Sequence, residues 1–175
     1  MKYIIHTDGG ARGNPGPAAV GVVIEISNNQ YPITNKEEKK IIEISKRIGE
    51  TTNNVAEYTA VVEALKEVKS SFGNTQDKQK SLLRRSGYEG RVGGQAKVKS
   101  EEGERPEVQF FLDSTLVVNQ LNGLFKIKDA RLRQLATQVH ILAAEVGGVV
   151  EYTVVRREQN KHADMLVNKA LDGEA

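Results

Sequence analysis

Residues 2–27, KYIIHTDGGARGNPGPAAVGVVIEIS, decide the fold of this chain. The β-rich run 2–7 ends at the glycines after Asp8, a turn dense in glycine and proline follows, and 19–27 is a second β-rich run. A third run of this kind, KIIEISKRI (40–48), comes after a polar loop. Three β-rich runs joined in this way predict an antiparallel meander.

The rest of the chain alternates between helical and strand patterns. Apolar residues recur at spacings of three and four over 54–69, which predicts a helix. The run VQFFL (108–112) is short and almost continuously apolar, as in a strand buried on both faces. Further patterns predict helices at 115–122, 129–146 and 161–171, the last capped by Asn160, and a strand at 148–155. The predicted order is β-β-β-α-β-α-α-β-α, an α/β fold.

The composition limits the class of protein. A length of 175 residues suits one domain with its own core. Lys and Arg total 25 against 23 Asp and Glu, which excludes a binder that works through bulk positive charge. The absence of cysteine excludes disulfides and thiolate metal sites. The opening MKYIIHTD has no apolar segment of the length that a signal peptide or membrane span requires, so we predict a cytoplasmic protein.

One segment, 72–107, does not fit the compact order. It is polar, contains several glycines and is longer than a usual connection. Between Lys78 and Lys99 it carries seven basic residues and a single acid, Glu89. Two interpretations stay open: a flexible surface insertion, or a basic arm that grips nucleic-acid phosphates. Neither requires a second domain, so we predict one domain over 1–175.

Four carboxylates stand in distinct local settings. Asp8 precedes two glycines, where turn chemistry is an ordinary explanation. Glu57 follows Asn54 at the spacing of a capping box, and Asp164 lies in the first turn of a predicted helix, where the helix dipole favours any acid. Asp113 is harder to explain, because an acid at the end of a buried strand is costly unless it meets a cation.

Convergence of these acids is the more informative interpretation. A parallel crossover places Asp8 and Asp113 at the same C-terminal edge of neighbouring strands, where α/β sheets bind ligands. If Glu57 and Asp164 reach that edge from their helices, four carboxylates meet. Such a set of hard oxygen ligands binds divalent metal ions and supports phosphoryl-transfer chemistry.

The stretches that contain these acids resemble a known family, the type 1 ribonucleases H. The resemblance covers nearly the whole chain apart from 72–107 and is closest to the archaeal and bacterial subgroup that lacks a basic protrusion and a catalytic-loop histidine. Four motifs carry it: DGGARGNPGPAAVG (8–21), TTNNVAEYTAVVEAL (51–65), FFLDSTLVVNQL (110–121) and REQNKHADMLVNKAL (157–171).

The resemblance implies a ribonuclease H-like fold, with three antiparallel strands and then two parallel strands in one five-stranded mixed sheet flanked by helices. It implies that Asp8, Glu57, Asp113 and Asp164 are the catalytic and metal-binding residues. Two Mg²⁺ ions are the implied cofactor, and Mn²⁺ is expected to substitute because it also accepts oxygen ligands. The implied reaction is endonucleolytic hydrolysis of the RNA strand of an RNA/DNA hybrid, which leaves 3′-hydroxyl and 5′-phosphate ends.

Substrate contacts are also predicted from the resemblance. Glycines let a backbone approach ribose hydroxyls closely, and short polar side chains can bind sugars and phosphates. The predicted contacts to the hybrid are Gly9, Gly10, Ala11, Arg12, Gly13, Asn14, Thr52, Asn53 and Asn54. We predict a monomer with no membrane partner and no obligate protein partner.

Two departures from the best-known family pattern leave the substrate class open. The stretch 154–160 has no histidine, and Arg156, Arg157 or Glu158 stands where one is common in the family. Residues 122–128 pass directly to the next predicted helix without a basic protrusion. These departures bear on turnover rate and hybrid selectivity, not on the reaction class. Because the acids alone do not select the second strand, two alternatives stay open: a nuclease of the same fold that acts on double-stranded RNA, and a non-catalytic module that binds RNA/DNA hybrids.

Overall fold

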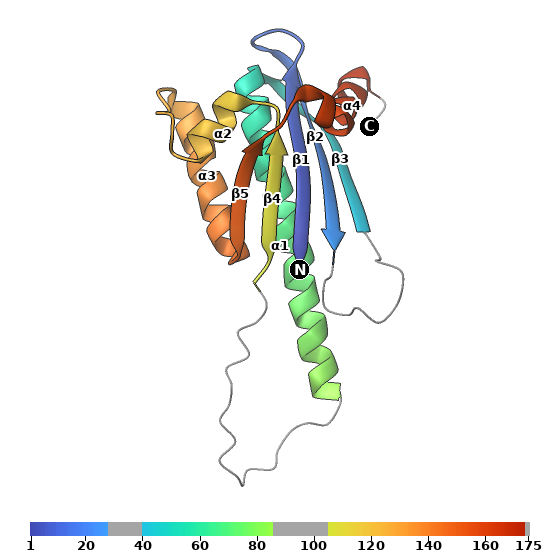
Figure 1. The fold of residues 1–175 in the computed structure, drawn as a ribbon. Helices are drawn as coiled ribbons and strands as arrows, with labels where there is room; N and C mark the ends of the chain where they lie inside the picture. The colour runs from blue at the N-terminus through green and yellow to red at the C-terminus, as the bar shows by residue number, and fades with distance from the viewer. Residues whose placement is uncertain (28–39, 86–104, 174–175) are drawn as a thin grey trace.

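The computed structural model describes residues 1–27, 40–85 and 105–173, with 72–85 in backbone only. Its sheet has the order β3-β2-β1-β4-β5. The strands are β1 (Lys2–Ala11), β2 (Gly16–Ser27), β3 (Lys40–Thr51), β4 (Glu107–Leu112) and β5 (Val149–Val154). β1, β2 and β3 pair antiparallel, whereas β4 and β5 run parallel to β1 (Figure 1). The predicted fold class, a five-stranded mixed sheet, is confirmed. The strands and α-helices also follow one another along the chain in the predicted order.

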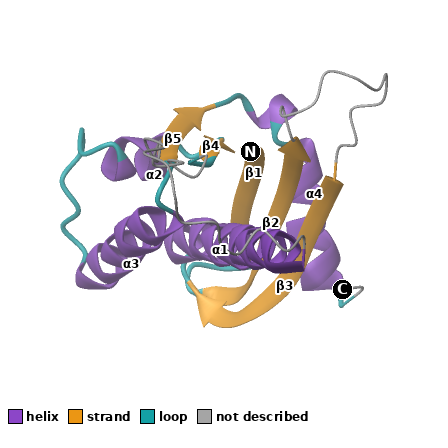
Figure 2. Ribbon diagram, turned by 90° about the horizontal axis from the view of Figure 1, so that it is seen from below, coloured by secondary structure: helices purple, strands orange, loops and turns teal. Residues whose placement is uncertain are grey.

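Helices cover both faces of this sheet. They are α1 (Asn53–Arg85), α2 (Thr115–Leu121), α3 (Ala130–Val146) and α4 (Lys161–Asp172), with a short 3-10 turn, η1, at Arg157–Gln159. α1 and α3 pack together on one side, and α4 lies across β1, β2 and β3 on the other (Figure 2). Within the described ranges, no helix is both long and apolar enough to cross a membrane.

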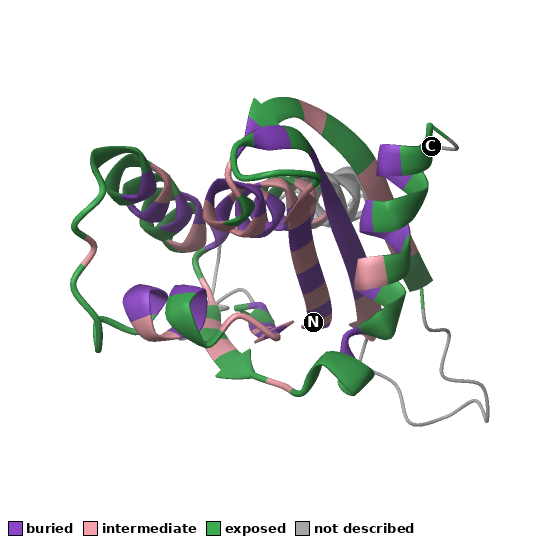
Figure 3. Cartoon of the chain, turned by 90° about the horizontal axis from the view of Figure 1, so that it is seen from above, coloured by how far each residue is buried: buried purple, intermediate pink, exposed green. Residues whose placement is uncertain are grey.

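Alternation along β1 divides the two faces. Tyr3, Ile5 and Thr7 are buried toward α1, where the main hydrophobic core lies. A small second cluster lies between α4 and β2 and consists of Ala19, Val167, Ala170 and Leu171. Figure 3 shows the buried segments of α4 on its side toward the sheet. The even-numbered residues of β1, among them Asp8, therefore face the side of the sheet that α4 covers.

The structure corrects the sequence-based boundaries in two places. β1 continues through Asp8 to Ala11, and Asp8 pairs with Gly21 of β2, so the acid lies inside a strand and not in a turn. α1 continues to Arg85, so the predicted insertion 72–107 begins as helix. Residues 76–85 are rich in Gln, Lys, Leu and Arg, which favour helix without an apolar stripe. Residues 28–39 and 86–104, including most of that insertion, lie outside the described residues.

Candidate active site

The parallel pairing of β1 with β4 places two acids side by side. The pairing register ends at His6 opposite Phe111, and the two rings stack with centroids 5.2 Å apart. Asp8 and Asp113 each stand two residues beyond that last pair. Both acids therefore lie just past the paired region, at the C-terminal edge of the central strands, as the sequence predicts.

Glu57 reaches this edge from the start of α1. The helix begins at Asn53, where the Thr52 hydroxyl accepts a hydrogen bond from the N–H of Val55 at 3.4 Å. Glu57 Oε2 accepts from the Ser114 hydroxyl at 2.7 Å, and Oε1 accepts from Asn53 Nδ2 at 3.1 Å. Both carboxylate oxygens are thus held by side chains around the site. The capping-box interpretation of Glu57 is not what the structure shows.

Gly9 allows the start of α1, which carries Glu57, to pack closely against β1, which carries Asp8. A Cβ built at Gly9 would lie 2.2 Å from the carbonyl carbon of Ala56 and 2.3 Å from the nitrogen of Glu57. Backbone atoms cannot yield at such distances as a flexible side chain can. The missing side chain of Gly9 therefore serves the packing of β1 against α1, whatever its part in substrate contact.

Replacing Gly9 with alanine is expected to push α1 away from β1. Overpacking of this kind costs about 1–3 kcal/mol of unfolding free energy, and it should also reduce any activity that needs Glu57 and Asp8 together. Chemical denaturation of Gly9→Ala measures the first effect. Gly10→Ala is the matched control, because its Cβ would meet only a side-chain methyl of Val167, at 3.0 Å. Equal losses for the two variants would contradict this account.

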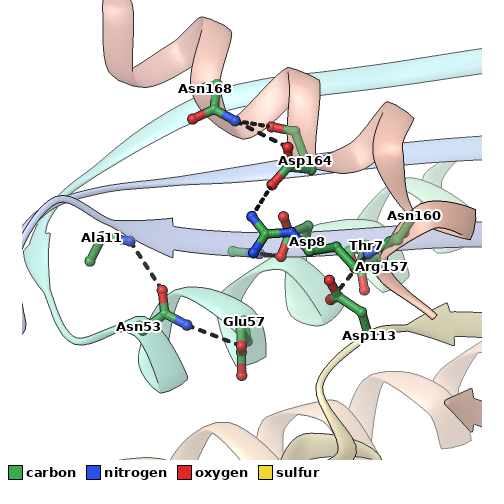
Figure 4. Close-up of polar contacts among 11 residues, drawn as sticks. Thr7, Asp8, Ala11, Asn53, Glu57, Asp113, Arg157, Asn160, Asp164 and Asn168 are labelled. Atoms are coloured by element: carbon green, nitrogen blue, oxygen red, sulfur yellow. Dashed lines mark hydrogen bonds and ion pairs between the residues drawn. The ribbon is translucent and has the colours of Figure 1, made fainter. Parts of the chain in front are cut away.

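Asp164 completes the set from the first turn of α4. Its Oδ1 is paired with Arg157 Nη2 at 2.9 Å, and its Oδ2 accepts from Asn168 Nδ2 at 3.2 Å (Figure 4). The helix is anchored to the sheet at its far end, where Arg47 Nε of β3 donates to the carbonyl of Ala170 at 2.8 Å. The position of Asp164 over the strand edge is therefore set by contacts along α4.

All four acids line one open cavity of about 340 Å³. Each of the four side chains is half-buried, between the sheet edge and solvent. The cavity also includes residues from the end of β1, the β1–β2 loop, the starts of α1 and α2, η1 and α4: Gly9, Gly10, Ala11, Arg12, Asn53, Ser114, Arg157, Val167, Asn168 and Leu171. The sequence-predicted carboxylates are thus brought together by the fold.

The electrostatics of the cavity are those of crowded negative charge. Burial and the neighbouring carboxylates, Asp113 foremost, together raise the pKa of Asp8 to about 7, against the opposing hydrogen bond from the Gly9 N–H. Burial also raises the pKa of Glu57, an effect that the Ser114 hydroxyl opposes. Acids that disfavour one another's ionisation are stabilised in their charged form by an added cation.

These residues fit divalent cations by the chemistry of their donors. Four carboxylates with no thiolate or imidazole among them are the oxygen ligands that Mg²⁺ prefers. As placed, however, no three His, Asp or Glu side chains in the described ranges are close enough to hold one ion together. The carboxylates are instead engaged by Arg157, Asn168, Asn53 and Ser114. Binding of an ion therefore requires side-chain movements that bring the carboxylates closer together.

The predicted substrate contacts gather at the same end of the molecule. Asn53 links them, because its Oδ1 accepts from the N–H of Ala11 and its own N–H donates to Asn14 Oδ1, both at 3.3 Å. Arg12 lines the cavity and is paired with Asp172 at the end of α4. The remaining predicted contacts flank these positions at the end of β1, on the β1–β2 loop and at the start of α1. Their contact with a nucleic acid stays a prediction.

Sequence reasoning missed the surroundings of the acids. Asn160 is predicted as a helix cap, but its side chain makes no capping hydrogen bond and donates to Asp113 instead. Ser114 supports Glu57 while its hydroxyl also accepts from Val117 N to cap α2. No local pattern distinguishes these roles from ordinary capping, since Asn and Ser are common caps.

Comparison with known proteins agrees with this geometry. A family model described as RNase H matches residues 1–79, and a model described as reverse transcriptase-like matches residues 101–170. The structure of LC11-RNase H1, isolated from compost, is 35% identical with a TM-score of 0.66, and the match covers 98% of this chain and 96% of that one. The chain belongs to the RNase H family.

Two curated proteins show the same relationship. Ribonuclease HI of Halobacterium salinarum is 30% identical over 169 residues, and the bifunctional protein Rv2228c of Mycobacterium tuberculosis is 31% identical over 175. The matches cover 95% and 100% of this chain, but the chain spans only 63% and 37% of the length of these relatives. LC11-RNase H1 has also been solved in complex with an RNA/DNA hybrid, at 34% identity, a TM-score of 0.65, and coverage of 98% and 97%.

Proposed function

We propose that this chain is a metal-dependent endoribonuclease that hydrolyses the RNA strand of RNA/DNA hybrids. The observation that carries the proposal is the position of Asp8 and Asp113 just past the paired region of β1 and β4, in a cavity that Glu57 and Asp164 also line. Family membership supports the reaction class. The proposed products carry 3′-hydroxyl and 5′-phosphate ends.

The four acids are the proposed ligands of two Mg²⁺ ions, which Mn²⁺ should replace. When bound, such ions polarise the phosphate and lower the pKa of water. The chain itself contributes orientation: Ser114 and Asn53 hold Glu57, while Arg157 and Asn168 hold Asp164. Hydrogen-bonded carboxylates lose less freedom when they bind an ion, so this shell favours a defined ligand arrangement.

The hybrid is the proposed substrate because the cavity opens onto a surface suited to sugars and phosphates. Backbone at Gly9–Ala11 and the side chains of Arg12 and Asn53 line it. None of these groups presents a pattern that selects one base, which suits recognition of duplex shape and 2′-hydroxyls. The complex of LC11-RNase H1 with an RNA/DNA hybrid supports the same substrate class for this chain.

Matched labelled duplexes test the proposal. RNA/DNA, RNA/RNA and DNA/DNA of one sequence are incubated with Mg²⁺, Mn²⁺ or EDTA, and strand fragments are resolved on gels. We expect cleavage of the RNA strand of the hybrid with either metal and none in EDTA. The fragments should be extended by a polymerase, which requires a 3′-hydroxyl.

Each other outcome has a definite meaning. Equal cleavage of RNA/RNA would retain metal-dependent hydrolysis but reassign the substrate to double-stranded RNA. Hybrid binding without cleavage in either metal would favour a non-catalytic binding module and overturn the proposal. Cleavage that persists in EDTA would remove the metal from the mechanism.

A further inference from the structure

Asn160 is a buried amide at the junction of η1 and α4. Its side chain is among the few buried polar groups in the described ranges, with 1% of the residue exposed. It stands at the N-terminal boundary of α4, where an asparagine side chain commonly caps the helix, yet it makes no capping hydrogen bond. The amide is turned inward, toward the sheet edge.

The contacts of Asn160 join three elements that carry site acids. Its Nδ2 donates to the carbonyl of Thr7, the residue before Asp8, at 3.0 Å. The same nitrogen donates to Asp113 Oδ1 at 3.3 Å, just past the end of β4. Its backbone carbonyl accepts from the N–H of Asp164 at 3.1 Å. Figure 4 shows the Asn160 side chain between Thr7 and Asp113.

The position of these contacts is informative. β1 and β4 pair only as far as His6 and Phe111, so the backbone ladder does not fix the spacing of the acids beyond them. Asn160 contacts both strands just past that point. Because both contacts come from Nδ2, while Oδ1 is buried without a hydrogen-bond partner in the described ranges, the amide acts here as a donor.

We propose that Asn160 is a positioning residue for metal binding: it orients the Asp113 carboxylate and joins the ends of β1 and β4 to the start of α4, so that the acids stay together at one edge of the sheet. The proposal rests on the proposed metal site. Removing an outer hydrogen-bond partner of a ligand typically costs about 10–100-fold in metal affinity or activity. The effect should appear in metal binding and kcat, and not in affinity for the hybrid.

The test compares Asn160→Ala with Gln120→Ala. Gln120 is the matched control, because it is also a buried amide with a cross-element hydrogen bond, from the Tyr58 hydroxyl at 3.0 Å. Mg²⁺ binding is measured by calorimetry without substrate, together with KM, kcat and the Mg²⁺ concentration for half-maximal cleavage. For Asn160→Ala we expect Mg²⁺ affinity about tenfold weaker, lower kcat and unchanged KM. For Gln120→Ala we expect lower stability with unchanged Mg²⁺ affinity.

A second variant keeps the proposal testable if Asn160→Ala does not fold. Asn160→Ser retains one donor, but its shorter side chain cannot reach both Thr7 and Asp113, so its Mg²⁺ affinity should also fall. Wild-type Mg²⁺ affinity in the folded variant, or a change confined to KM, would overturn the proposal while wild-type cleavage stands. Failure of the wild-type protein to bind Mg²⁺ and cleave would instead overturn the proposed function.

Discussion

Asp8→Asn is expected to reduce hybrid cleavage by about a thousandfold or more while the fold stays intact. Ion-mediated stabilisation of a phosphoryl transition state is worth several kcal/mol, and each 1.36 kcal/mol is tenfold in rate. Asp8 lies among the other three acids, each of which acts on its ionisation. Asparagine is nearly isosteric and keeps the Oδ1 acceptor that the Gly9 N–H uses at 2.8 Å. Single-turnover cleavage at saturating Mg²⁺ is the measurement.

The control must show that the loss of cleavage comes from a change in the four-acid cavity and not from the removal of any one carboxylate. Glu145→Gln also exchanges a carboxylate for an amide, but Glu145 is exposed on α3, away from the cavity. Among the described residues, its one ion pair is with Lys69, at 2.9 Å. Its cleavage rate should match that of wild type. If Asp8→Asn retained cleavage within tenfold of wild type, the four-acid cavity would not be the reaction centre.

The arrangement of elements was predictable because it follows from local patterns. The alternating runs, the short apolar strand at 108–112 and the helical periodicity at 54–69 each report burial directly. The parallel relationship of β1 and β4 then places Asp8 and Asp113 at one edge without further information. This explains why acids distant in sequence could be assigned to one site before their geometry was known.

The roles that sequence reasoning missed depend on contacts between distant segments. The sequence around Gly9 does not indicate that a side chain is excluded there. Only the close approach of α1 in the structure shows the reason. Asn160 and Ser114 both occupy capping positions, so their bonds to Asp113 and Glu57 had no separate signal. The end of α1 was misplaced for another reason: helix propensity alone extends it past the last apolar repeat.

Arg157 partly neutralises the negative charge of the four carboxylates in the metal-free cavity. The guanidinium is exposed and is paired with Asp164, and its pKa is raised by that hydrogen bond and by the charges of Asp164, Asp8 and Asp113. Arg12 also lines the cavity but is paired with Asp172, so the four acids retain an excess of negative charge, and a pair as exposed as Arg157–Asp164 contributes little to stability. Burial, together with the repulsion that remains, raises the pKa of Asp8, and this makes the stability of the metal-free protein depend on pH.

In EDTA, Asp8→Asn is expected to be more stable than wild type, by an amount that grows between pH 5 and pH 8. The pKa of Asp8 is raised from 3.8 to about 7 in the folded protein. A carboxyl whose folded pKa is raised favours the folded state at low pH, and this stability is lost as pH rises through the folded value. With this pKa shift, the difference in unfolding free energy between Asp8→Asn and wild type should increase by about 3 kcal/mol from pH 5 to pH 8. Asparagine does not ionise, so the variant avoids this loss.

Denaturant titrations of both proteins at each pH give the difference directly. Comparing the two cancels the contributions of groups that do not interact with Asp8, such as His6, whose pKa burial lowers and which acts in the opposite direction. Saturating Mg²⁺ should shrink or reverse the difference, because only wild type keeps all four carboxylate ligands and a bound ion stabilises the folded state. A difference that is equal at pH 5 and pH 8, or unaffected by Mg²⁺, would mean that Asp8 is not the acid whose charge the cavity resists. The protein alone would then stabilise the ionised form of Asp8, and the electrostatic argument that Asp8 binds a metal ion would fail.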